Sequence, residues 1–121
     1  MTKLFGKVDK GWGHELIWAS TDQYCCKFLN FDRPAAKTSM HYHEHKDEQW
    51  YVQSGRFQVD WINLDDGSTK FCNLEVGDTW HNYAGTPHRL VCIEPGTVVE
   101  VSTADSVEDN YRIIPGDSQQ Q

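Results

Sequence analysis

The spacing of short apolar runs is the feature that most constrains the fold of this chain. Stretches such as YCCKFLNF (24–31), RFQVDWIN (56–63) and HRLVCIE (88–94) mix apolar and polar side chains over six to eight residues, and turn residues separate such runs every eight to twelve positions. No segment repeats its apolar residues with the 3.6-residue period of a helix. Regularly spaced short strands with turns between them are typical of an all-β sandwich or barrel. The sequence therefore predicts one antiparallel β domain, closed into a barrel.

Nine strands are expected, and the turn signals between them place their ends. They cover residues 14–20, 24–31, 39–43, 48–54, 56–63, 69–74, 78–83, 88–94 and 97–103. LDDGS (64–68) is predicted to be a hairpin loop with Gly67 in a left-handed conformation. The whole chain, 1–121, reads as a single domain with its core over about 12–114 and a flexible tail over 115–121.

Charge and composition exclude several classes of function. The 121 residues carry a net charge of -7 without any basic run, which argues against nucleic acid as a partner. No stretch approaches the roughly 20 apolar residues of a membrane span, and no apolar signal-peptide core follows the N-terminus. The four cysteines form no CxxC pair. We expect reduced cysteines and a cytoplasmic protein.

The stretch HYHEHKDEQWYVQSG (41–55) contains most of a metal site. His41 and His43 lie two residues apart, so on a strand both project to the same side. Glu48 opens the next predicted strand, and His88 begins a later one after the turn AGTP. Three neutral imidazoles and a carboxylate suit a divalent transition ion such as Fe, Mn, Co, Ni, Cu or Zn. The alternative is a solvated loop that is rich in histidine.

Two motifs in this part of the chain resemble those of the cupin superfamily. The first, H-x-H-x4-E-x6-G, and the second, which ends in G-x2-H, fall at His41, His43, Glu48, Gly55, Gly77, Gly85 and His88. The resemblance implies a double-stranded β-helix (jelly-roll) barrel. It also implies a metal ion held by His41, His43, Glu48 and His88.

Three further stretches resemble the cupin domain of type II mannose-6-phosphate isomerases. These are WGHELIWA (12–19), DEQWYVQSG (47–55) and VVEVSTADSVEDNYRI (98–113). The resemblance implies a metal-dependent sugar-phosphate isomerase or epimerase that interconverts an aldose and a ketose through an enediol. Its partner would be a small-molecule sugar or sugar phosphate.

That chemistry needs a proton carrier and groups that hold the substrate. Candidates for the base are His45, His81 and Glu100, although His45 also reads as a plain loop residue and His81 as an ordinary strand histidine. Candidates for substrate binding are Lys46, Trp50, Arg89 and Arg112, where arginine binds a phosphate by two hydrogen bonds and lysine as a point charge. Arg89 is expected to point away from His88, toward the outside of the barrel.

Two other functions remain open at this stage. The same ligand set occurs in cupin dioxygenases that use Fe(II), and a small cupin can also be a non-enzymatic, metal-containing sugar-binding domain. Restriction of activity to Fe(II) or Cu(II) with oxygen uptake would favour the dioxygenase. The resemblance further implies a homodimer, for which the outward-facing Tyr51 and Gln53 are the first residues to test.

Overall fold

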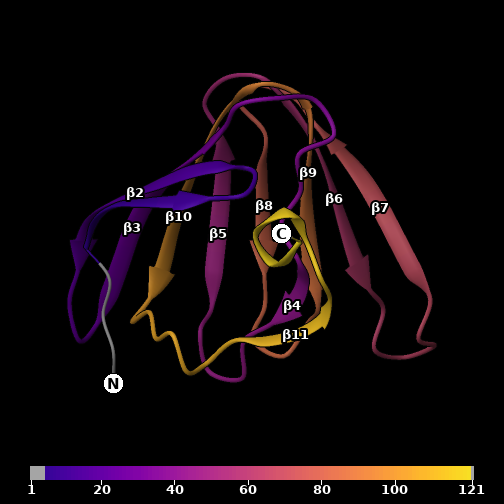
Figure 1. Cartoon of the computed structure of the whole chain (residues 1–121). Helices are drawn as coiled ribbons and strands as arrows, with labels where there is room; N and C mark the ends of the chain where they lie inside the picture. The colour runs from indigo at the N-terminus through magenta and orange to yellow at the C-terminus, as the bar shows by residue number, and fades with distance from the viewer. Residues whose placement is uncertain (1–4, 121) are drawn as a thin grey trace.

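The computed structural model describes residues 5–120, which form two antiparallel β-sheets that face each other (Figure 1). The elements are β1 (Gly6–Lys10), β2 (Gly13–Ser20), β3 (Tyr24–Phe31), β4 (Met40–Tyr42), β5 (Glu48–Val52), β6 (Arg56–Ile62), β7 (Thr69–Leu74), β8 (Thr79–Asn82), β9 (His88–Glu94), β10 (Gly96–Thr103), β11 (Tyr111–Ile114) and the short 3-10 helix η1 (Asp117–Gln119).

The order of the strands is that of a jelly roll. One sheet has six strands in the order β1-β2-β3-β10-β5-β8, and the other has five in the order β11-β4-β9-β6-β7. β10 lies between β3 and β5, and β9 lies between β4 and β6, so the chain crosses repeatedly from one sheet to the other. Such crossovers generate the double-stranded barrel. The predicted fold is confirmed.

Each of the nine predicted strands is present, and those at 24–31, 69–74 and 88–94 agree at both ends. The pattern did not predict β1 (GKVDK) or β11 (YRII), which are the first strands in the two sheet orders. Both are short, and β11 is exposed along its whole length. β1 has only one apolar residue, Val8, and β11 is exposed on both faces, so neither shows the apolar alternation from which a strand is recognised in sequence.

Aromatic and aliphatic side chains fill one end of the space between the sheets. Trp12 stacks on Phe31 with ring centroids 4.4 Å apart, and Phe31 meets Phe57 edge to face at 5.1 Å. Val59 and Leu90 are fully buried beside them. Burial of one such side chain stabilises the fold by roughly 1.5–3 kcal/mol.

The LDDGS loop closes the β6–β7 hairpin as predicted. The Asn63 amide donates to the Ser68 carbonyl at 2.8 Å, and Gly67 has a φ of 73°, the left-handed conformation that glycine adopts without strain. Gly55 has a φ of 80°, and a Cβ atom there would lie 2.6 Å from the Glu94 carbonyl oxygen. This close approach accounts for the glycine at the end of the first metal motif.

The end of the chain packs against the barrel. The Asp117 carboxylate accepts a hydrogen bond from the Lys37 amide at 2.9 Å, and the Ser118 hydroxyl accepts one from the Gly11 amide at 3.0 Å. The sequence predicted a flexible tail over 115–121, whereas the structure docks residues 116–119 beside β1, β2 and the segment before β4. Among residues 5–120 no helix is long and apolar enough to cross a membrane.

Candidate metal centre

Three histidines converge between the two sheets. His41 on β4 is the direct pairing partner of His88, the first residue of β9, and His43 follows just after β4. Their ring centroids lie 4.8–5.6 Å apart. One nitrogen from each ring falls within 4.8 Å of the other two, which is the spacing of atoms that share one ion.

Backbone carbonyls fix the tautomer of all three rings. The Nδ1 atoms of His41, His43 and His88 lie 2.8, 2.7 and 2.9 Å from the carbonyl oxygens of Ser39, Asp109 and Thr86 respectively. A carbonyl oxygen can only accept, so each Nδ1 carries the hydrogen and each Nε2 keeps its lone pair. A hydrogen bond from the second ring nitrogen to a carbonyl is the usual support of a metal-binding histidine.

Glu48 stands beside this histidine group. Glu48 is the first residue of β5 and is 3% exposed. One carboxylate oxygen, Oε1, lies 2.7 Å from His88 Nε2, and the other, Oε2, lies 3.9 Å from His43 Nε2. The four residues predicted as metal ligands are therefore brought together, with the three imidazoles as the tight group and the carboxylate at its side.

The donor set fits a divalent metal ion. His88 Nε2 is buried and makes no hydrogen bond with the described part of the chain, so its lone pair is available. Burial lowers the pKa of His41 and of His43, which keeps both rings neutral near pH 7. Burial alone would raise the pKa of Glu48, but the Lys46 ammonium outweighs it and holds that pKa well below its usual value. Neutral imidazoles and an ionised carboxylate are the forms that coordinate transition metals.

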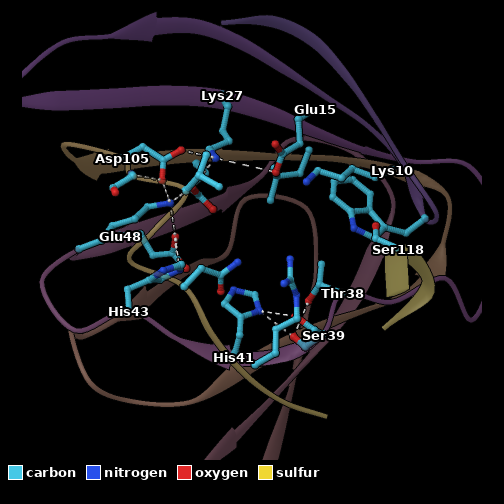
Figure 2. A pocket seen from close by; sticks show the side chains of 18 of the residues that line it. Lys10, Glu15, Lys27, Thr38, Ser39, His41, His43, Glu48, Asp105 and Ser118 are labelled. Carbon is cyan, nitrogen blue, oxygen red and sulfur yellow. Dashed lines mark hydrogen bonds and ion pairs between the residues drawn. The ribbon is translucent and has the colours of Figure 1, made fainter. Parts of the chain in front are cut away.

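A cluster of buried and partly buried charges adjoins the histidines, and Figure 2 shows part of it. This lysine–carboxylate cluster consists of Glu15, Lys27, Lys46, Glu48, Glu100 and Asp105. The Lys46 ammonium lies 3.3 Å from Glu48 and 3.1 Å from both Glu100 and Asp105. The Lys27 ammonium lies 3.1, 3.7 and 3.8 Å from Asp105, Glu100 and Glu15.

Both lysines of the cluster are held in their charged form. Burial by itself lowers the pKa of a lysine, but the surrounding carboxylates, Glu100 first among them, raise the pKa of Lys27 and of Lys46 above the ordinary value. Neither amine is therefore a base or a nucleophile near neutral pH. Each acts instead as a fixed positive charge between carboxylates.

A cavity of about 210 Å³ opens onto His41, His43 and the cluster. Its wall includes Trp50, as predicted, together with Lys10, Arg112 and Ser118 near the end of the chain. Within residues 5–120, the side chains of Lys10 and Arg112 have no ion-pair or hydrogen-bond partner. Two free cations at a small cavity suit a small anionic ligand.

The structure separates the other predicted site residues into two groups. The cavity that His41 and His43 line is also lined by Lys46, Trp50, Glu100 and Arg112, whereas His45, His81 and Arg89 lie outside it. Among the cavity residues, Lys46 contacts three carboxylates and is not free to hold a phosphate.

The three residues outside the cavity have other surroundings. The side chain of His45 is 82% exposed, and His81 lies 2.9 Å from the Asp47 carboxylate and stacks on Tyr83. Arg89 donates to the carbonyls of Thr38 and Pro115, on the outside of the barrel as its strand parity indicated.

Several residues of the site were missed in the sequence. Lys27 had a signal, since it falls between Cys25 and Leu29 on the inward side of β3, where the other residues are apolar. Asp105 lies in an irregular segment after β10 and carries no periodic signal. Asp109 accepts hydrogen bonds from the amides of Glu44, His45 and Lys46 at 2.7–3.1 Å and so shapes the metal loop.

Comparison with known proteins identifies the family and the fold. The cupin domain model matches residues 32–103. Oxalate decarboxylase from Bacillus subtilis superposes with a TM-score of 0.76 at 17% identity, covering 90% of this chain and 30% of that one. The capsular polysaccharide assembling protein CapF from Staphylococcus aureus gives 0.75 at 14% identity, covering 93% and 35%. KdgF from Halomonas sp. gives 0.65 at 26% identity, covering 78% and 82%.

These similarities support different conclusions, because they cover different shares of the other proteins. The chain spans about a third of the length of oxalate decarboxylase and of CapF, and those two likenesses establish the fold alone. KdgF is similar over most of both chains. The Bacillus subtilis oxalate decarboxylase has Mn(II) centres. No curated protein sequence matches this chain.

Proposed function

This chain belongs to the cupin family, and from that premise we propose that it is a metal-dependent isomerase or epimerase of a small sugar derivative, such as a sugar phosphate, acting through an enediol. The observation that carries the proposal is the position of Glu100. This buried carboxylate lines the same cavity as His41, His43 and Glu48 and is held there by neighbours on both of its oxygens.

The histidines supply the first requirement of the reaction. Their Nδ1–H groups are committed to carbonyls, so the three Nε2 atoms, with Glu48, would hold the ion. A divalent ion bound there supplies a Lewis acid for the carbonyl oxygen and the adjacent hydroxyl oxygen of the substrate. Neighbouring oxygens on C1 and C2 of an aldose or ketose suit such binding.

Glu100 supplies the second requirement, a proton carrier. Burial raises the pKa of Glu100, and the negative charge of Glu48 adds to the shift. A carboxylate with a raised pKa is a stronger base than an ordinary one. Its Oε1 accepts from the Trp50 indole at 3.0 Å and its Oε2 accepts from the Lys46 ammonium at 3.1 Å. In the proposed reaction Glu100 takes the proton from C2 and returns it to C1, while the hydroxyl proton passes from O2 to O1. An aldose thereby becomes a ketose without any external reagent.

The cavity wall supports a small anionic substrate. A cavity of about 210 Å³ is below the usual range for drug-sized ligands, so it suits a compact molecule. Lys10 and Arg112 are the cations left to bind a phosphate or carboxylate group, because Lys27 and Lys46 are already paired. The free cysteines are consistent with the reducing cytoplasm that we propose as its location.

Proton exchange provides the test. Metal-reconstituted protein is incubated in heavy water with a panel of aldose and ketose phosphates, and the C1 and C2 proton signals are followed by NMR. We expect metal-dependent loss of one of these signals, and Glu100→Gln should slow the exchange by at least 100-fold, the lower end of what a positioned general base contributes. Glu15→Gln is the matched control, since Glu15 lines the same cavity and, among residues 5–120, its carboxylate forms an ion pair with Lys27 alone, at 3.8 Å.

Two results would contradict the proposal. One is the absence of exchange for every substrate when the metal content of the protein is shown to be stoichiometric. The other is an equal loss in Glu15→Gln and Glu100→Gln, which would show that Glu100 acts only through the charge of the cluster. Oxygen uptake in the same samples would favour the dioxygenase instead.

A further inference from the structure

Asn82, which the sequence did not single out, lies buried between the metal centre and an outer groove. It is the last residue of β8, is 2% exposed and pairs directly with Glu48 across the two strands. Its Nδ2 donates to Glu48 Oε1 at 3.2 Å, and its Oδ1 accepts from the Trp80 indole Nε1 at 3.0 Å. Both ends of the amide are therefore used.

Trp80 decides which way round the amide lies. An indole N–H can only donate, so it must face the amide oxygen, and this leaves the NH2 group for Glu48. If the amide were reversed, its oxygen would face the carboxylate and its NH2 would face the indole N–H, and both contacts would be repulsive. The Trp80 indole thus ensures that Asn82 presents a donor to the metal centre.

Glu48 is held by a different donor on each carboxylate oxygen. Asn82 bonds Oε1, the oxygen that lies 2.7 Å from His88 Nε2, and the Lys46 ammonium lies 3.3 Å from Oε2. A carboxylate fixed at both oxygens cannot rotate away from the histidines without losing one contact in a buried site. We propose that Asn82 is a positioning residue that orients Glu48 toward the metal ion, with Trp80 fixing the orientation of Asn82.

Trp61 offers an internal control for this proposal. Its ring lies 4.7 Å from that of Trp80, and both line the same outer groove of about 620 Å³. Both tryptophans are partly buried. Within the described chain, however, the Trp61 indole nitrogen donates to no other group. Trp80→Phe and Trp61→Phe therefore remove similar volume from one ring pair, and only the first removes the hydrogen bond to Asn82.

The test measures metal binding, so it does not depend on the proposed reaction. Metal-free protein is titrated with Zn²⁺ against a competing chelator, and the visible absorption of bound Co²⁺ reports the ligand set. We expect Asn82→Leu to bind Zn²⁺ 10- to 100-fold more weakly, the usual effect of losing a group that supports a metal ligand. Trp80→Phe should weaken binding about 5- to 10-fold and alter the Co²⁺ spectrum, while Trp61→Phe should change neither.

Urea unfolding of the metal-free proteins separates positioning from packing. The two tryptophan variants should lose similar stability, because their rings pack in the same pair. Equal loss of Zn²⁺ affinity in Trp80→Phe and Trp61→Phe, or wild-type affinity in Asn82→Leu, would overturn the proposal. If Asn82→Leu does not fold, the tryptophan pair decides by itself.

Discussion

Two adjacent rows of side chains in the six-stranded sheet, one on each face, reverse the usual distribution of polarity. On the inner face, Lys27, Glu100 and Trp50 lie side by side in register on β3, β10 and β5, and all three are buried. On the outer face, the adjacent row crosses four strands and is apolar. It contains Leu16, Phe28, Val99 and Tyr51.

The outer face is also open to solvent. Leu16 and Tyr51 are 39% and 47% exposed, and Trp18, which stacks on Phe28, is 53% exposed. Charged side chains are rarely buried unless they are paired, and each inner charge here has an oppositely charged neighbour. Strand parity, and not polarity alone, therefore decides which side chains this sheet buries. Partners inside the barrel make the inner charges tolerable.

Among the substitutions considered, removal of one cation from the inner face should lower the free energy of unfolding most. Lys46→Met leaves the buried carboxylates of Glu48 and Glu100 and the partly buried one of Asp105 without that neighbour, and breaking a buried ion pair costs about 3–5 kcal/mol. We expect this fall in the free energy of unfolding, measured by urea denaturation of the metal-free protein. Arg56→Met, which breaks an exposed pair with Glu75 at 2.9 Å, should change little. Equal losses of unfolding free energy in Lys46→Met and Arg56→Met would contradict this, because the inner ion pairs would then stabilise the fold no more than an exposed pair.

The second largest effect should come from acid, which removes the stability that the Asp105 carboxylate contributes on the inner face. Burial alone would raise the pKa of Asp105, but the ammonium groups of Lys46 and Lys27 outweigh it and hold the pKa well below its usual value. A lowered pKa contributes stability above the unfolded value of about 3.9, and this contribution is lost as pH falls. We expect Asp105→Asn to cost about 2 kcal/mol near pH 7, the value of hydrogen bonds to a charged group, and less as the pH falls below about 4. A constant difference between variant and wild type from pH 7 to pH 3 would contradict this.

The outer face should tolerate change best. Tyr51→Lys replaces a half-exposed side chain, so we expect less than about 0.5 kcal/mol change in the unfolding free energy of the monomer. The homodimer predicted from the sequence would place a second copy on this apolar row, because contiguous exposed apolar patches mark association sites. Light scattering should then show two chains for the wild type and one for Tyr51→Lys.

Phe71→Lys is the matched control for that experiment. Phe71 is 66% exposed on β7 of the other sheet, so its replacement should leave the dimer intact. A wild-type protein that stays monomeric at high concentration would remove the dimer from consideration. Dissociation by Phe71→Lys with no effect of Tyr51→Lys would instead move the interface to the other sheet.

Much of the fold and the ligand set could be predicted, because both depend on local patterns. The two-residue spacing of His41 and His43, the turn before His88 and the loop glycine Gly67 are visible in a short window of sequence. The roles of Lys46, Asp105 and Asn82 depend on which residues the crossover strands bring beside them. Lys46 and Glu100 are 54 residues apart, and no local pattern links them.

The sequence by itself determined nine of the eleven strands in residues 5–120, the common side of His41 and His43, and the residues able to bind a metal. A period of two and a few turn residues are properties of the chain over five to ten residues. Only the tertiary structure decided that Lys46 is enclosed by carboxylates, that Arg112 remains free, and that Asn82 bonds the metal-site glutamate. These facts depend on long-range strand pairing and on the competition of buried groups for partners, which no short stretch of sequence contains.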